Sequence, residues 1–164
     1  MKKLFIVAAF TLFGITASNA QGVHLGANAA IPVGDADGGY GFGLALDFSY
    51  LFAVNDVFHV GPSASVLHYF GKEEDFGPIT IENDDATFIP IGGEARFWLE
   101  QFFFNAHLGY GIGVAPDGND GGFYYRPGVG YMFTESVGAA ASYSGITVDG
   151  GTFSSVNFGA TFRF

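Results

Sequence analysis

Cysteine is absent from this chain of 164 residues, and its absence excludes two classes of exported protein. A disulfide framework needs paired cysteines, and a lipid-anchored lipoprotein needs a cysteine to carry the lipid. Basic residues are also scarce, because six Lys and Arg stand against 16 Asp and Glu, for a formal net charge of −10. Nucleic-acid binding requires a basic patch, so we expect no nucleic-acid partner.

Beyond residue 20 the chain also lacks any apolar run near the roughly 18 residues that a transmembrane helix requires. Leucine, lysine and arginine are few, whereas the chain has 26 glycines and 20 phenylalanines. Such a composition disfavours helices and favours short aromatic strands.

The first 20 residues have the pattern of a cleaved export signal. Lys2 and Lys3 form a basic start, residues 4–15 are apolar, and small residues at 18–20 suit a signal peptidase. The sequence therefore predicts a signal peptide at 1–20, cleavage before Gln21, and a mature domain at 21–164.

Apolar and polar residues alternate along most of the mature chain. A strand places successive side chains on opposite faces, so the last segment has a fully apolar face, while Arg163 lies on the other. The apolar face consists of Val156, Phe158, Ala160, Phe162 and Phe164. Similar alternation predicts strands at 22–31, 40–52, 57–70, 87–99, 102–115, 122–133 and 137–144, with the eighth strand ending at 164. Pro62 predicts a bulge or locally weak pairing in the third strand.

No amphipathic helix is available to cover these apolar faces, so we predict an all-β fold in which the strands close with lipid outside. The expected architecture is an eight-stranded antiparallel up-and-down transmembrane β-barrel. Connections alternate between short ones, at 53–56, 100–101 and 134–136, and long ones, at 32–39, 71–86, 116–121 and 145–152. In outer-membrane barrels short turns face the periplasm, which would place both termini there.

An eight-stranded barrel is narrow enough for side chains to fill its interior. Inward-facing charges must then pair with one another. The predicted lumen ion network consists of Asp47, Glu94, Arg96, Arg126 and Arg163. The alternative interpretation is an anion-selective filter. Inward-facing glycines are expected to thin the plug locally.

Most of the acidic residues fall in the long connections. They include Asp35, Asp37, Glu73, Glu74, Asp75, Asp84, Asp85, Asp117 and Asp120. One interpretation is solubility of exposed loops, and the other is cation bridging to lipopolysaccharide or recognition of a basic partner. Residues 117–121 lack the spacing of an EF-hand and are interpreted as a turn, so no metal site is predicted. Residues 77–83 are either a strand extension or a plain loop.

We predict no catalytic residue and no cofactor. An enzyme would require a nucleophile and a base near the outer leaflet, and His68 is the one histidine close to a long loop. Ser142, Ser144 and Glu73 are the residues that would have to approach His68 to complete a catalytic set.

With this leader, alternation, loop asymmetry and terminal phenylalanine, the chain resembles small outer-membrane β-barrels of the OmpA/OmpX type, with a porin-like barrel domain. The resemblance implies that Val156, Phe158, Phe162 and Phe164 form the signal read by the periplasmic β-barrel assembly machinery. It also implies contact with outer-membrane lipid and lipopolysaccharide of a Gram-negative bacterium, and strand addition by a protein partner at the outer loops.

We expect a monomer with a structural or surface-interaction role. The alternative is a narrow porin-like channel for small solutes, and a lipid A-modifying enzyme is the third hypothesis.

Overall fold

Eight long strands form the wall of the molecule. The computed structural model describes residues 22–76, 79–148 and 150–164, with the backbone alone at 73–76 and 79–82. The strands are β1 (Val23–Val33), β2 (Tyr40–Tyr50), β4 (Phe58–Gly71), β7 (Ala86–Leu99), β8 (Phe102–Ala115), β9 (Gly122–Met132), β10 (Val137–Val148) and β11 (Gly151–Arg163). The predicted signal peptide lies outside the described residues. In the described part of the chain, no helix has the length and apolar character needed to cross a membrane.

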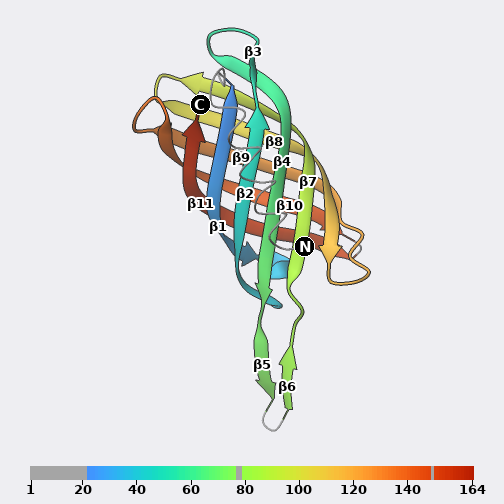
Figure 1. The fold of residues 1–164 in the computed structure, drawn as a ribbon. Coiled ribbons are helices and arrows are strands. Elements are labelled where there is room, and N and C mark those ends of the chain that lie inside the picture. Colours follow the sequence, from blue (N-terminus) through green and yellow to red (C-terminus); the bar gives the residue numbers. More distant parts are fainter. Residues whose placement is uncertain (1–21, 77–78, 149) are drawn as a thin grey trace, which may run out of the picture.

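The sheet is antiparallel throughout and closes on itself (Figure 1). Strand β1 pairs with β2 on one side and with β11 on the other, so that Ala27 lies opposite both Leu46 and Ala160. Closure gives each of the eight strands two paired neighbours, as backbone in hydrocarbon requires. The predicted eight-stranded up-and-down barrel is confirmed.

The predicted alternation produces an apolar outer face. On β8, Phe104, Leu108 and Tyr110 are between 51% and 58% exposed, whereas Phe103 and His107, at the alternate positions, are buried. Strand β2 repeats the pattern, with its leucine and phenylalanine side chains outside. A continuous apolar surface of this extent is suited to contact with lipid.

The two ends of the barrel carry connections of different length. Gly22 donates a backbone hydrogen bond to Phe164 (3.3 Å), so the described chain begins and ends at the same end. We call this the short-turn end, because it also carries the turns at 54–57, 100–101 and 133–136. The opposite, long-loop end carries the 3-10 turn η1 (Gly34–Ala36) and the longest connection.

That longest connection contains a second, two-stranded sheet. Strands β5 (Glu73–Phe76) and β6 (Ile79–Glu82) pair antiparallel and project beyond the barrel (Figure 1). Of the two interpretations of 77–83, the strand extension is therefore correct over 79–82.

The prediction of a long loop at 145–152 is wrong. Strand β10 continues to Val148, and Ile146 pairs with Phe153 of β11. Ile146 is 1% exposed, so burial of its side chain inside the barrel extends the strand past Gly145. Gly150, directly before β11, lies in a turn with a φ of +93°.

Pro62 produces weak pairing without a bulge. Its pairing with Gly93 of β7 keeps the register of the neighbouring residues. On its other side, the ladder between β2 and β4 ends at Ser49, and pairing resumes with the two-residue strand β3 (Phe52–Ala53). A proline has no N–H to donate, which explains the break. The register shift along β4 lies elsewhere, between Tyr40 and Phe42 of β2.

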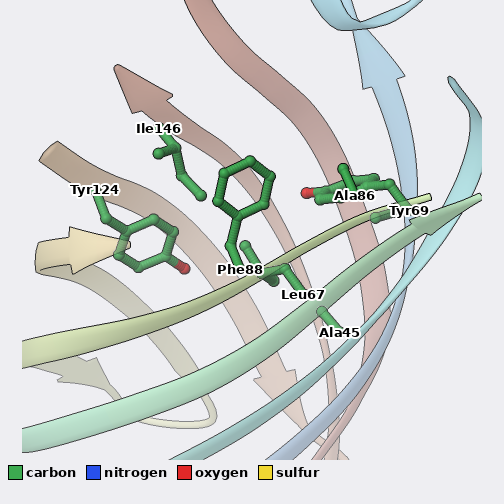
Figure 2. Close-up of a cluster of buried hydrophobic side chains, with 8 residues drawn as sticks. Ala45, Leu67, Tyr69, Ala86, Phe88, Tyr124 and Ile146 are labelled. Atoms are coloured by element: carbon green, nitrogen blue, oxygen red, sulfur yellow. The ribbon is translucent and has the colours of Figure 1, made fainter. Parts of the chain in front are cut away.

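Apolar side chains fill the long-loop half of the interior. Figure 2 shows aromatic and aliphatic side chains from several strands packed against one another. This long-loop cluster consists of Ala30, Ala45, Leu67, Tyr69, Ala86, Phe88, Tyr124 and Ile146. A short-turn cluster of Trp98, Phe103 and Met132 packs near the short-turn end.

At Gly43 and Gly130 the inward glycines make room for large side chains, so the expectation that inward glycines thin the plug is wrong at these two positions. A Cβ atom at Gly43 would lie 2.6 Å from Cδ1 of Tyr69. At Gly130 it would lie 2.1 Å from Cζ of Phe103. Both distances are far below normal van der Waals contact, so the rings occupy the space that the missing side chains leave.

Candidate functional site

Four of the five charges predicted to form the lumen network lie between the two apolar clusters, and they form two ion pairs. Arg126 of β9 contacts Asp47 of β2 at 2.6 Å, and Arg96 contacts Glu94 on β7, also at 2.6 Å. All four side chains point inward, as the parity of their strands predicts. We call these pairs and their hydrogen-bond partners the lumenal network.

The Asp47 carboxylate accepts hydrogen bonds from three strands besides its own. Oδ1 accepts from Arg126 Nη1 at 2.6 Å and from Ser65 Oγ at 2.7 Å, while Oδ2 accepts from Asn28 Nδ2 at 2.7 Å. Arg126 also donates through Nε to Ser142 Oγ at 2.7 Å. These contacts tie β1, β2, β4, β9 and β10 together across the lumen.

Glu94 is the most deeply buried charge, with 1% exposure. Its Oε1 accepts from Arg96 Nε at 2.9 Å and Nη2 at 2.6 Å, and Ser49 donates to its Oε2. His107 Nε2 lies 3.6 Å from the same carboxylate. The remaining Arg96 donor, Nη1, bonds His24 Nδ1 at 2.8 Å, which requires that nitrogen to accept.

Two carboxylates therefore balance two guanidinium groups inside the barrel. Buried charges are tolerated when they are paired and further hydrogen-bonded. Each carboxylate here has a hydroxyl donor besides its arginine, and each arginine has a second acceptor besides its carboxylate. The cavity beside them is small, about 30 Å³, and its polar lining suits it to hold ordered water. The network is thus a packed polar layer between two apolar layers.

Arg163 is not part of this network. It is exposed at the short-turn end, with its guanidinium carbon 5.6 Å from the ring centroid of Trp98. The alternation placed Arg163 on the inward face correctly, but it lies next to the last residue, where the strand has already reached the barrel mouth. Without it the lumenal charges sum to zero.

Sequence reasoning missed the polar partners of the charges and a second polar chain. Tyr69 OH lies 2.8 Å from Ser155 Oγ, which in turn lies 2.8 Å from Ser144 Oγ. Asn157 Nδ2 donates to Ser144 Oγ at 3.0 Å. Ser144, Ser155 and Asn157 lie at inward-facing positions of β10 and β11, and the alternation of these strands could have predicted their place in the lumen.

The residues considered for an enzyme are not brought together. His68 lies on the outer face, with Nδ1 2.9 Å from Thr87 Oγ1 and Nε2 3.5 Å from Asp85. Ser142 and Ser144 point into the lumen, where they bond Arg126 and Asn157. The Glu73 side chain lies outside the described part of the structure. Within that part, no cluster of three or more His, Asp or Glu side chains is suited to a metal ion.

No protein-family model matches the chain, and no curated protein matches it in sequence. Solved structures do match. Ail, an outer membrane protein of Yersinia pestis, determined in a phospholipid nanodisc, is 19% identical with a TM-score of 0.59, over 88% of this chain and 99% of Ail. A crystal structure of Ail with the heparin analogue sucrose octasulfate gives 19% identity and a TM-score of 0.56, over 87% and 97%. A de novo designed transmembrane β-barrel gives 9% and 0.54, over 90% and 98%.

The fold is that of a small outer-membrane β-barrel. The four residues of the predicted assembly signal lie on the outer face of β11 or directly after it. Phe158 is 52% exposed and Phe164 is 55% exposed, and the backbone N–H of Phe164 bonds Val23. Recognition of all four residues by assembly machinery stays a prediction.

The predicted acidic loop residues gather at the long-loop end. Asp37 contacts Lys72 Nζ at 3.3 Å, and Asp35 accepts from the backbone of Thr152 at 3.4 Å. Asp85 accepts from the backbone N–H of Gly71. Exposed side chains at the same end are those of Asp84, Asp117 and Asp120, while Glu73, Glu74 and Asp75 belong to β5.

Proposed function

We propose that this chain is a bacterial outer-membrane protein whose barrel is a rigid, filled support for an acidic surface at the long-loop end. The observation that carries the proposal is the interior: an apolar cluster, a neutral polar layer and a second apolar cluster follow one another along the lumen. A barrel filled in this way is better suited to a structural or display role than to the transport of solutes.

The display surface consists of the long loops and the β5–β6 hairpin. The hairpin strands pair only with one another among the described residues, so both outer edges offer backbone groups to a further strand. The surrounding carboxylates favour a basic protein segment, or lipopolysaccharide bridged by divalent cations. The structure of Ail with sucrose octasulfate involves a polyanion, a ligand that these acidic loops would repel.

A narrow channel for small solutes is the second candidate. The two ion pairs beside the small cavity favour it, since charged groups around a constriction can select ions. The side chains of both apolar clusters would have to move for a solute to pass. A lipid A-modifying enzyme is less well supported, because His68 bonds Thr87 on the outside while the candidate serines bond lumenal residues.

Surface display of the long-loop end is tested by epitope insertion in living cells. A short epitope between Phe76 and Ile79 should bind antibody on intact cells. The same epitope in the turn at 54–57 should bind only after the outer membrane is permeabilised. Equal labelling of both insertions on intact cells, or labelling of the 54–57 insertion alone, would contradict the proposed orientation and function.

A further inference from the structure

The short-turn mouth of the barrel holds two adjoining hollows, and His24 is the one member of the lumenal network that lines either of them. Their volumes are about 640 and 460 Å³, and they share Ala53, His59, Glu135 and Arg163 in their walls. We call the two together the vestibule. Barrel mouths are among the places where small-molecule sites occur, and volumes of this order are typical of such sites.

Arg163 is the one unpaired permanent cation among the described residues. The other three bases there each contact a carboxylate: Lys72 with Asp37, Arg96 with Glu94 and Arg126 with Asp47. Arg163 contacts no described carboxylate within ion-pair distance, and its side chain is exposed in the vestibule. A guanidinium group has five donors in a planar fork that matches a carboxylate.

An aromatic wall lies beside this guanidinium group. The Trp98 ring lies 5.6 Å from Arg163 and 6.1 Å, centroid to centroid, from the His59 ring. Met132 and Phe133 continue the apolar lining. A cation donor next to an apolar wall is the arrangement that holds an anionic group and the apolar body attached to it.

We propose that the vestibule binds a small solute that carries one carboxylate next to an aromatic or apolar group. The carboxylate takes the bidentate position on Arg163, and the apolar part packs on the exposed ring of Phe133, beside the buried Trp98 and Met132. The rim carries acidic residues on the turns, namely Asp56, Glu100 and Glu135. These carboxylates repel every anion and repel multiply charged anions most, so the site favours a ligand with a single carboxylate over a polyanion. This site is at the opposite end from the display surface and is independent of it.

Trp98 makes the site directly measurable, because it is the only tryptophan in the chain. The refolded mature chain, in lipid nanodiscs, is titrated with phenylacetate while Trp98 fluorescence is recorded. Phenylacetamide, which has the same ring and no charge, is the matched probe. We expect a saturable change with phenylacetate and affinity at least about tenfold weaker for the amide, the scale of a charge-assisted hydrogen bond. A non-saturable response, or equal affinity for both probes, would overturn the proposal.

Variants then assign the effect to Arg163. Arg163→Gln should weaken phenylacetate binding about tenfold, while Arg163→Lys retains part of the affinity because the charge remains. Lys72→Gln, at the other end of the barrel, should leave binding unchanged. Unchanged affinity in Arg163→Gln, or an equal loss in Lys72→Gln, would contradict the assignment. If Arg163→Gln does not fold, the acid and amide comparison on the unaltered chain decides.

Discussion

At the scale of single residues, the lumenal carboxylates Asp47 and Glu94 organise the polar layer of the lumen. Asp47 and Glu94 each combine a guanidinium partner with a hydroxyl donor from another strand. Each carboxylate therefore has a second link to the barrel wall besides its ion pair. Removing one partner of a buried ion pair lowers stability strongly, whereas replacing both partners with apolar residues lowers it far less. Comparing single and double variants therefore separates the electrostatic contribution of the pair from the packing of its side chains.

Replacing Arg126 with methionine should lower the free energy of unfolding by about 3–5 kcal/mol, because Asp47 is left without its counter-charge. Replacing both partners, as Asp47→Leu with Arg126→Met, should recover most of that loss. Urea titration of the refolded barrel in lipid vesicles measures both. Arg163→Gln, at the exposed mouth, is the control and should change stability by less than about 1 kcal/mol. A double variant as unstable as the sum of its single variants would contradict this account.

The substitution Gly130→Ala tests whether an aromatic ring occupies the space beside this inward-facing glycine. Gly130→Ala places a methyl group against the Phe103 ring, and overpacking of this kind costs about 1–3 kcal/mol. Gly93→Ala is the matched change, because its Cβ would meet only the Gly61 carbonyl oxygen at an ordinary 3.6 Å. Thermal unfolding followed by gel mobility should show a clear loss for the first and little for the second. Equal stability of the two variants would mean that the Phe103 ring has room to move.

At the scale of elements, the barrel and the β5–β6 hairpin are separate sheets. The hairpin leaves the barrel between Lys72 and Asn83, where the backbone N–H of Asn83 bonds the carbonyl oxygen of Lys72 at 3.1 Å. That ladder closes before β5 begins, so the barrel does not depend on the hairpin for its hydrogen bonds.

Deletion of residues 73–82, with a short glycine linker in their place, should leave the heat-dependent gel shift and the urea midpoint unchanged. The physical reason is that the deleted strands pair only with each other among the described residues. Loss of the gel shift would show that the hairpin supports the barrel, contrary to the proposed role in display.

The elements were predictable wherever apolar and polar residues alternate without interruption. Strand β8 is the clearest case, because its apolar set is unbroken from Phe102 to Val114. The last hairpin was not predictable, since Gly145 interrupts the pattern and only burial of Ile146 extends β10. The pairing of Asp47 with Arg126 was also beyond the sequence, because parity gives the face of a residue and not its depth or its partner across the lumen.

At the scale of the whole molecule, charged residues lie at the two ends and in one neutral layer between them. The lumen is neutral, and both ends carry acidic residues, while Arg163, which has no carboxylate partner among the described residues, lies at the short-turn end. The outer face is apolar around the barrel. This arrangement separates the lipid contact, the packed interior and the two ends, so that each end can interact with a different environment.

Side chains fill the barrel, and single-channel recording tests this filling most directly. The refolded mature barrel is placed in a planar bilayer at neutral pH, with folding established beforehand by the heat-dependent gel shift. A filled lumen should carry no steady current. Stable conductance steps that change when Glu94 or Arg126 is replaced would contradict it, because they would mean that ions pass through the lumenal network.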